Sequence, residues 1–133
     1  MPTAPAPGPD DEAELAIVFV DSNNTEAGAE AAAQVLEPDG SAITFQNGLG
    51  NVETLQRVLG RERVLAGSSM CSAAVLGPGH VSLTHMGPTT LGETDGTGSD
   101  RAASVLAALG DAGFDVHPSG EIMAVIWQKF VVN

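Results

Sequence analysis

One lysine is the residue of this sequence best placed to do chemistry. Lys129 is the only lysine among 133 residues, and it lies in the most apolar segment, IMAVIWQKFVVN. At 100° per residue, Lys129 and Asn133 share a helical stripe with three apolar side chains, those of Ile122, Val125 and Ile126. Such a lysine either extends its amine to solvent at the helix end or is desolvated, with its pKa lowered from about 10.4. Only the desolvated amine is a useful general acid near neutral pH.

A glycine-rich loop, FQNGLGNVETLQ at residues 45–56, is the second candidate. Gly48 and Gly50 precede a helical pattern, as the first two glycines of a dinucleotide-binding loop do. The third glycine would be residue 53, but Glu53 places a carboxylate in the first helical turn, where it would repel a phosphate. Two interpretations remain: a turn that needs positive φ at both glycines, or a different part of an active site.

The histidines and the cysteine predict no further site. His80, His85 and His117 have no metal-ligand spacing with one another or with Cys71, so no metal site is expected. Cys71 falls in a predicted strand without a basic neighbour, and we expect it to be buried and unreactive. A single cysteine cannot form an internal disulfide, which is typical of a protein from the reducing cytoplasm.

Composition excludes two classes of partner. Hydrophobic residues make up 43% of the chain, a globular composition, and 17 acidic residues against five basic ones give a net charge of −12. Such a surface would be repelled by a nucleic-acid backbone and by an anionic membrane. No apolar run approaches the roughly 20 residues that a membrane-spanning helix needs.

The elements that must position these residues alternate along the chain. Apolar and β-branched runs predict strands at residues 15–20, 41–45, 64–76, 80–85, 89–93 and 114–117. Helical patterns cover residues 23–36, 52–59, 101–112 and 119–133. Turns are predicted at 37–40, 77–79 and 86–88, and the last two suggest hairpins. This order predicts an α/β fold with a largely parallel sheet.

Helix ends and the N-terminal segment carry their own signals. Gly60 is expected to end the second helix, and Ser99 or Asp100 to cap the third. Residues 1–14 hold four of the eight prolines in their first nine positions, followed by acidic residues, and predict a disordered Pro/acidic leader.

Four stretches in order resemble the ketopantoate reductase (2-dehydropantoate 2-reductase) family. Members typically carry an IVxVK strand, a QNGLGN loop, a GxGHVxxT…GPTxxGE cluster and an IWxKLxxN helix. This sequence has IVFVD at residues 17–21, QNGLGN at 46–51, GPGHVSLTHMGPTTLGE at 77–93 and IWQKFVVN at 126–133. Together the four matches cover nearly everything from residue 15 to the end.

The resemblance implies a role for each candidate residue. Lys129 matches the family's catalytic general acid, and Asn47 and Asn133 match its substrate-binding asparagines. Asn47 also lies between substrate and cofactor, and Gly48 and Gly50 let the backbone run close to the nicotinamide end of NADPH. The implied reaction is NADPH-dependent reduction of ketopantoate, a 2-oxo acid, to pantoate on the way to pantothenate and coenzyme A.

The same resemblance implies a partial domain. Residues 15–133 match the second half of the family's NADP-binding domain, a partial Rossmann-like (doubly wound) sheet. Its first strands and glycine-rich pyrophosphate loop are expected to be absent, as is the helical C-terminal domain. Asp21 stands where the family usually has a lysine that touches the cofactor phosphate.

Two functions follow from this sequence. The first is a 2-dehydropantoate 2-reductase-like oxidoreductase, truncated, with a small 2-oxo acid as its substrate. The alternative is a non-catalytic fragment or interaction module. Without its usual neighbour, the strand at 15–20 would be an open sheet edge that pairs with a second copy or with a complementing chain.

Overall fold

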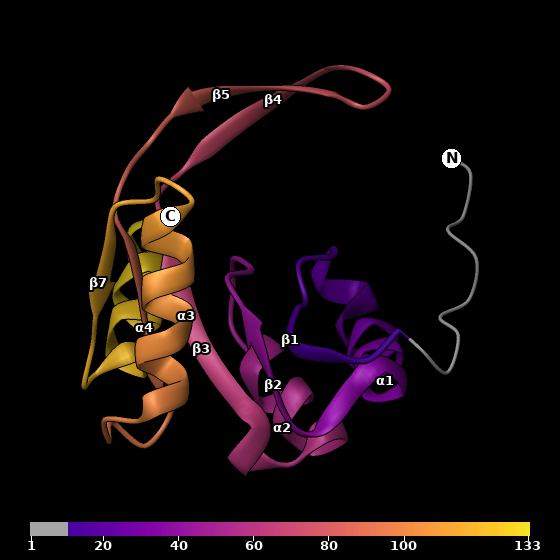
Figure 1. Cartoon of the computed structure of the whole chain (residues 1–133). Helices are drawn as coiled ribbons and strands as arrows, with labels where there is room; N and C mark the ends of the chain where they lie inside the picture. The colour runs from indigo at the N-terminus through magenta and orange to yellow at the C-terminus, as the bar shows by residue number, and fades with distance from the viewer. Residues whose placement is uncertain (1–10) are drawn as a thin grey trace.

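The computed structural model describes residues 11–133, which form a five-stranded sheet with helices on both faces (Figure 1). The strand order is β1-β2-β3-β6-β7; β3 and β6 are antiparallel, and the other neighbours are parallel. The strands are β1 (Ala13–Ile17), β2 (Leu36–Thr44), β3 (Val64–Ser69), β6 (Thr89–Glu93) and β7 (Val116–Pro118). The predicted α/β fold with a largely parallel sheet is confirmed.

Two clusters of buried side chains lie on opposite faces of the sheet. Alternate residues of β2 enter different clusters, Ala42 on one face and Ile43 on the other, because successive side chains of a strand point to opposite faces. The Ala42 face is covered by α1 (Thr25–Val35), α2 (Asn51–Leu59) and α4 (Ile122–Val132). The Ile43 face is covered by α3 (Asp100–Asp111), which lies in front of the strands in Figure 1. Single 3₁₀ turns, Ser22–Asn24 and Arg61–Arg63, precede α1 and β3.

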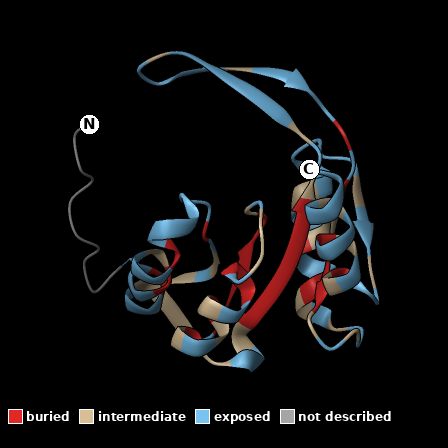
Figure 2. Cartoon of the chain, turned by 180° about the vertical axis from the view of Figure 1, so that it is seen from behind, coloured by how far each residue is buried: buried red, intermediate tan, exposed pale blue. Residues whose placement is uncertain are grey.

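A hairpin extends away from this sheet. It consists of β4 (Ser72–Gly77) and β5 (His80–His85), which pair only with each other in the described chain. Nearly all of its residues are exposed, whereas β3, which leads into it, is buried (Figure 2). The hairpin is therefore attached to the core only through its two ends.

The predicted strand at 64–76 is wrong as a single element. Residues 64–69 belong to the main sheet and residues 72–77 to the hairpin, with Met70 and Cys71 between them. The turn at 77–79 does close a hairpin, but the turn at 86–88 does not, because β6 returns to pair with β3. Residues 64–76 are mostly small and apolar, so their sequence does not indicate the break at Met70 and Cys71. That break depends on where β6 pairs with β3.

Other boundaries differ by a few residues. β1 begins at Ala13, inside the predicted leader, and ends at Ile17 instead of residue 20. Residues 37–40 belong to β2, at an irregular step of its pairing with β1, where a turn was predicted. The last strand is displaced to Val116–Pro118. Residues 1–10 of the predicted leader lie outside the described residues.

The predicted helix ends are confirmed at two positions. Gly60 follows α2 with a φ of 95°, a conformation that glycine adopts without strain. Ser99 caps α3, because its side chain accepts a hydrogen bond from the backbone N–H of Ala102.

Candidate functional site

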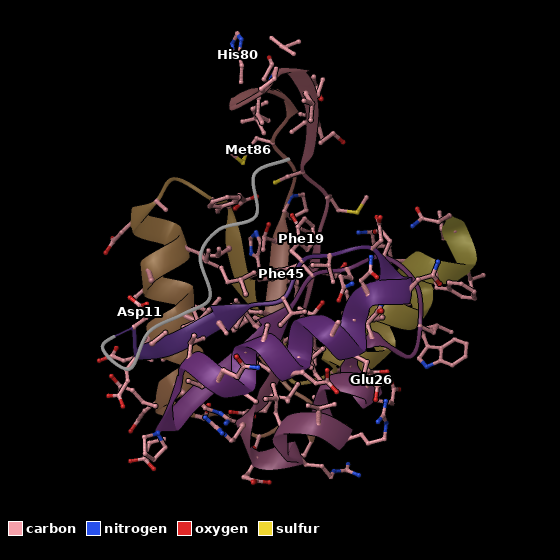
Figure 3. All side chains as sticks on the ribbon, turned by 90° about the vertical axis from the view of Figure 1, so that its right-hand side faces the viewer. Asp11, Phe19, Glu26, Phe45, His80 and Met86 are labelled. Atoms are coloured by element: carbon pink, nitrogen blue, oxygen red, sulfur yellow. The ribbon has the colours of Figure 1, made fainter. Side chains whose placement is uncertain are left out.

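An open cavity of about 680 Å³ lies beyond the carboxyl ends of β1, β2 and β3. In parallel α/β sheets this edge is where ligands bind, because loops of adjacent strands diverge there. Phe19 and Phe45 both line the cavity, and in Figure 3 they appear below the hairpin, whose tip carries His80. Asn47, Lys129 and Asn133 line it too, so three residues predicted from sequence meet at one place.

The glycine loop forms a tight connection between β2 and α2. Gly48 and Gly50 have φ values of 91° and 88°, as the turn interpretation required. A side chain at either position would strain the backbone. No heavy atom outside the neighbouring residues lies within 4 Å of where their Cβ atoms would be, so the loop backbone is open to approach.

Polar side chains at both ends of the loop hold it in place. Gln46 donates from Nε2 to Thr25 Oγ1 at 3.0 Å and to the carbonyl oxygen of Val20. Thr25, which is buried, donates in turn to Asn51 Oδ1 at 2.8 Å. Because each polar atom in this group has a partner, the network fixes the loop against α1.

This network leaves the Asn47 side chain available. The Asn47 carbonyl oxygen accepts hydrogen bonds from Asn51 Nδ2 at 3.1 Å and from Ser22 Oγ at 3.4 Å. The Asn47 amide is exposed and has no hydrogen bond within residues 11–133. Because the backbone of Asn47 is fixed and its side-chain amide is not hydrogen-bonded, the amide can both donate hydrogen bonds to a ligand and accept them from it.

Lys129 lies in the last turns of α4, with its amine turned back toward the sheet. Its Nζ donates to the carbonyl oxygen of Ser69 at the end of β3, at 2.6 Å. The residue is half-buried, and burial lowers the pKa of its amine. Of the two interpretations of the lysine, the geometry favours the desolvated one. Asn133 lies one helical turn further on, at the end of α4.

The two glycines are placed differently from the other predicted residues. Gly48 lines a narrow cleft beside the cavity together with Asn47, Lys129 and Asn133. Gly50 lies at the start of α2 and lines, together with Gly48, another small cleft that Lys129 and the two asparagines do not line. The structure thus groups Gly48 with the lysine and the asparagines and leaves Gly50 further away.

Three cavity residues carried no signal in the sequence. Ser69 and Thr89 are partners in the pairing of β3 with β6, and their hydroxyls lie 2.9 Å apart. Cys71 also lines the cavity and is half-buried, so the prediction of a buried strand residue is wrong. A hydrogen bond with Ser69 is the main cause of a lowered pKa of the Cys71 thiol; burial opposes this shift, and hydrogen bonds with the Gly87 backbone and Thr89 add to it. Strand pairing brings these three residues together.

A second open cavity, of about 290 Å³, adjoins the first on the side of α1. Phe19, Asp21 and Asn47 are among its lining residues. The carboxylate of Asp21 would repel a phosphate group there.

Within residues 11–133, no cluster of three or more histidine, cysteine or acidic residues could hold a metal ion. None of the helices in that range is long and apolar enough to span a membrane.

A family model and the sequences of known proteins both relate this chain to the same protein family. The family model described as "Ketopantoate reductase PanE/ApbA" matches residues 1–96. The chain is 34% identical over 123 residues to 2-dehydropantoate 2-reductase of Halobacterium salinarum, and 35% over 123 residues to that of Archaeoglobus fulgidus. Each alignment covers 92% of this chain and 40% of the relative. The chain therefore spans less than half the length of these relatives.

Solved structures agree on the fold. Over 92% of this chain and 40% of the other, it resembles 2-dehydropantoate 2-reductase from Geobacter metallireducens, with a TM-score of 0.83 and 28% identity. It also resembles a D-mandelate dehydrogenase solved with NADH and anilino(oxo)acetate, with a TM-score of 0.76 and 24% identity. That match covers 90% of this chain and 39% of the dehydrogenase, and it is a likeness of fold.

Proposed function

Because the chain belongs to the ketopantoate reductase PanE/ApbA family, we propose that it carries the substrate side of a 2-dehydropantoate 2-reductase active site. The reaction is the NADPH-dependent reduction of ketopantoate, a 2-oxo acid, to pantoate. One observation carries the proposal: Lys129, Asn47 and Asn133 line a single cavity at the carboxyl ends of the strands. The relatives that match the chain bear the name of this activity.

Lys129 is the proposed general acid. Reduction of a ketone by hydride creates an alkoxide, which must take up a proton to become the alcohol. The protonated amine of Lys129 stabilises the developing negative charge and donates its proton to that oxygen, and solvent then restores the proton. The Ser69 carbonyl, 2.6 Å from Nζ, holds the amine at the cavity wall.

Asn47 and Asn133 are the proposed substrate-binding residues. An amide can bind the carboxylate or a hydroxyl of a 2-oxo acid without a change in its own charge. The Gln46–Thr25–Asn51 network supports this role, because it fixes the loop backbone while the Asn47 side chain stays exposed. Orientation of the substrate by such fixed groups lowers the entropic part of the barrier.

A nicotinamide dinucleotide would supply the hydride when bound, and we propose NADPH. The residues present fit its nicotinamide end: the backbone at Gly48 and Gly50 is open, and Phe19 and Phe45 offer apolar surface. The phosphate end fits less well, because Asp21 lines the adjoining cavity. The Asp21 carboxylate only accepts hydrogen bonds, so the pyrophosphate would require donors from elsewhere, and we propose that a complementing polypeptide provides them.

The proposal is tested by NADPH oxidation with ketopantoate, followed by absorbance. The chain is assayed alone and mixed with a polypeptide that supplies a glycine-rich nucleotide-binding half. We expect ketopantoate-dependent oxidation, and we expect Lys129→Ala to lower kcat by about 10²- to 10⁴-fold, the usual contribution of a general acid. Gln128→Ala, at the exposed neighbouring position, is the matched control. Absence of oxidation in both arrangements refutes the proposal.

One observation favours the alternative function, an interaction module. β1 lies at the edge of the sheet, and Ile17 at its end is 53% exposed. Exposed edge strands pair readily with strands of other chains. Light scattering combined with the oxidation assay separates the two functions: a stable oligomer without NADPH oxidation would support the interaction module, and a stable monomer would argue against edge pairing. The reducing cytoplasm remains our prediction for the compartment.

A further inference from the structure

Thr89 is a buried polar residue at the wall of the cavity that Lys129 lines. It is the first residue of β6, it is 3% exposed, and its neighbours in the sheet are Ser69 of β3 and Val116 of β7. Its backbone N–H donates to the carbonyl oxygen of Asp115 at 2.7 Å. Because Thr89 is packed and paired on both sides, its hydroxyl is a fixed hydrogen-bonding group.

The backbones of Ser69 and Thr89 do not bond to each other. The N–H that follows Ser69, that of Met70, donates to the carbonyl oxygen of Pro88 at 3.0 Å. Ser69 and Thr89 therefore form a non-hydrogen-bonded antiparallel pair, in which opposite side chains come closest. Their hydroxyl oxygens are 2.9 Å apart. At this position the side chains supply the cross-strand hydrogen bond that the backbone does not.

The Ser69 carbonyl is available to Lys129 for the same reason. In a non-hydrogen-bonded pair the carbonyl group points away from the partner strand. On the other side of β3, the pairing with β2 ends at Ala66. Neither neighbouring strand takes the Ser69 carbonyl oxygen, and the amine of Lys129 donates to it at 2.6 Å.

Beyond Ser69 the chain leaves the main sheet. Met70 and Cys71 lead into the hairpin, whose residues are nearly all exposed. The backbone N–H of Cys71 donates to Ser69 Oγ at 3.3 Å, and Cys71 Sγ lies 3.9 Å from Thr89 Oγ1. These contacts and the Thr89–Ser69 hydrogen bond hold the end of β3 where it passes into a segment that packs little.

We propose that Thr89 is a positioning residue for Lys129: its hydroxyl fixes Ser69, and the Ser69 carbonyl in turn fixes the Lys129 amine at the cavity wall. A proton reaches the substrate oxygen efficiently only if the amine stays in place, and a displacement of about 1 Å can slow catalysis about 10²-fold. This consequence for reduction rests on the proposed function, whereas the relay of hydrogen bonds does not.

The test follows the titration of Lys129, the only lysine, by NMR of a chain labelled with ¹³C at lysine Cε. Thr89→Val keeps the shape of the side chain and removes its hydroxyl. A buried amine without a fixed partner is less favourable than a solvated one, so Lys129 should turn toward solvent and its titration midpoint should rise by at least about half a pH unit. Within residues 11–133, the other titratable side chain that lines the cavity is Cys71. An unchanged or lower midpoint overturns the proposal.

Three further variants separate positioning from a general loss of stability. Thr89→Ser keeps the hydroxyl and should retain the wild-type midpoint. Thr90→Val removes a hydroxyl on the opposite face of β6, away from the cavity, and should leave the midpoint unchanged. Ser69→Ala removes the same hydrogen bond from its other end, so it should raise the midpoint as Thr89→Val does, and the double variant should raise it no further. Additive shifts, or an equal shift in Thr90→Val, contradict the relay.

NADPH oxidation with ketopantoate, measured in the same variants, separates this proposal from the proposed function. We expect Thr89→Val to lower kcat at least about tenfold, with KM within about twofold of the wild-type value, and Thr89→Ser to retain most of the rate. An unchanged kcat in Thr89→Val would overturn the catalytic consequence. A shifted midpoint in a chain that oxidises no NADPH refutes the proposed function and leaves the relay intact, and oxidation with an unchanged midpoint does the reverse.

Discussion

At the scale of single residues, the candidate site depends on Asn47 and Lys129, which are fixed in position by few hydrogen bonds and can still bind a ligand. The Asn47 backbone is bound by Asn51 and Ser22, while its amide remains exposed. The Lys129 amine is half-buried and bound to a single carbonyl oxygen, that of Ser69. Groups fixed in this way lose little further freedom when a ligand arrives, which favours binding.

The titration of Lys129 is the first prediction. Burial lowers the pKa of its amine, so we expect the proton to leave below the ordinary lysine value of about 10.4. Because Lys129 is the only lysine, a chain labelled with ¹³C at lysine Cε gives one side-chain resonance whose titration NMR can follow. A midpoint at or above the ordinary value would contradict the burial seen here.

The same shift determines the direction of a stability change. Between the lowered pKa and about 10.4, the unfolded chain holds more protons at this site than the folded chain. The contribution of Lys129 to the free energy of unfolding should therefore rise as pH increases through that window. Lys129→Met should remove this contribution, because methionine does not titrate.

At the scale of elements, close contacts between strands and their neighbours shape the cavity wall. Gly67 of β3 lies under the ring of Phe45, and a Cβ at residue 67 would come within 2.2 Å of that ring. Phe45 follows β2 and lines the cavity. A glycine in β3 therefore allows an aromatic ring to come close to the strand at the edge of the site.

Gly67→Ala tests this contact. The added methyl group must displace Phe45 or the strand, and overpacking of this kind costs about 1–3 kcal/mol of unfolding free energy. Gly77→Ala is the matched control in β4, since no heavy atom outside the neighbouring residues lies within 4 Å of its Cβ position. Urea denaturation measures both variants, and equal stabilities would show that the Phe45 contact is unimportant.

An ion pair joins β6 to the start of α3. Glu93 is bound by Arg101 through two hydrogen bonds of 2.6 Å, and its side chain is 9% exposed. The Arg101 hydrogen bond is the main cause of the lowered pKa of Glu93. A carboxyl group whose pKa is lowered on folding stabilises the fold above its ordinary pKa and loses that contribution as pH falls through the lowered value.

Replacement of Glu93 tests this linkage. Glu93→Gln should lower the free energy of unfolding at pH 7 by about 1.5–3 kcal/mol, the usual contribution of a hydrogen bond to a charged group. It should also flatten the loss of stability that we expect of the wild-type chain below about pH 5. Arg57→Ala, which breaks the exposed pair with Glu26, should change that acid dependence much less. An unchanged pH profile in Glu93→Gln would show that Glu93 is not the group responsible.

At the scale of the whole molecule, the described chain consists of a packed sheet and a hairpin that packs little against it. Ile43 and Leu65 in the central strands are fully buried. In the hairpin, Val75 is 80% exposed and its cross-strand partner Val81 is 61% exposed. Local contact and burial determine how readily a segment opens, so the two parts should differ in stability.

Amide hydrogen exchange should reveal this difference. We expect the amides of β4 and β5 to exchange at least about 10²-fold faster than those of β2 and β3, because hairpin opening breaks bonds only between its own two strands. Two-dimensional NMR resolves the residues concerned. Equal protection in hairpin and sheet would mean that the hairpin is held by contacts beyond its own pairing.

The sequence predicts the local parts of this fold better than the way they join. The β-α alternation, Gly60 at the end of α2 and the Ser99 cap depend on residues a few positions apart, and all are confirmed. Residues 64–76 were predicted as one strand because the break at Met70 and Cys71 depends on where β6 pairs. For the same reason, Ser69, Cys71 and Thr89 could not be predicted to line the cavity.

What the sequence determined by itself is most of the local elements, the positive φ of Gly48 and Gly50, the charge of −12 and the family resemblance. These features depend on residue type, short-range spacing and order along the chain. The tertiary structure decided that Lys129 meets the Ser69 carbonyl, 60 residues away, and that β1 lies at the edge of the sheet with Ile17 53% exposed. Such contacts depend on how distant segments pack, because side-chain burial and amine desolvation arise only when those segments come together.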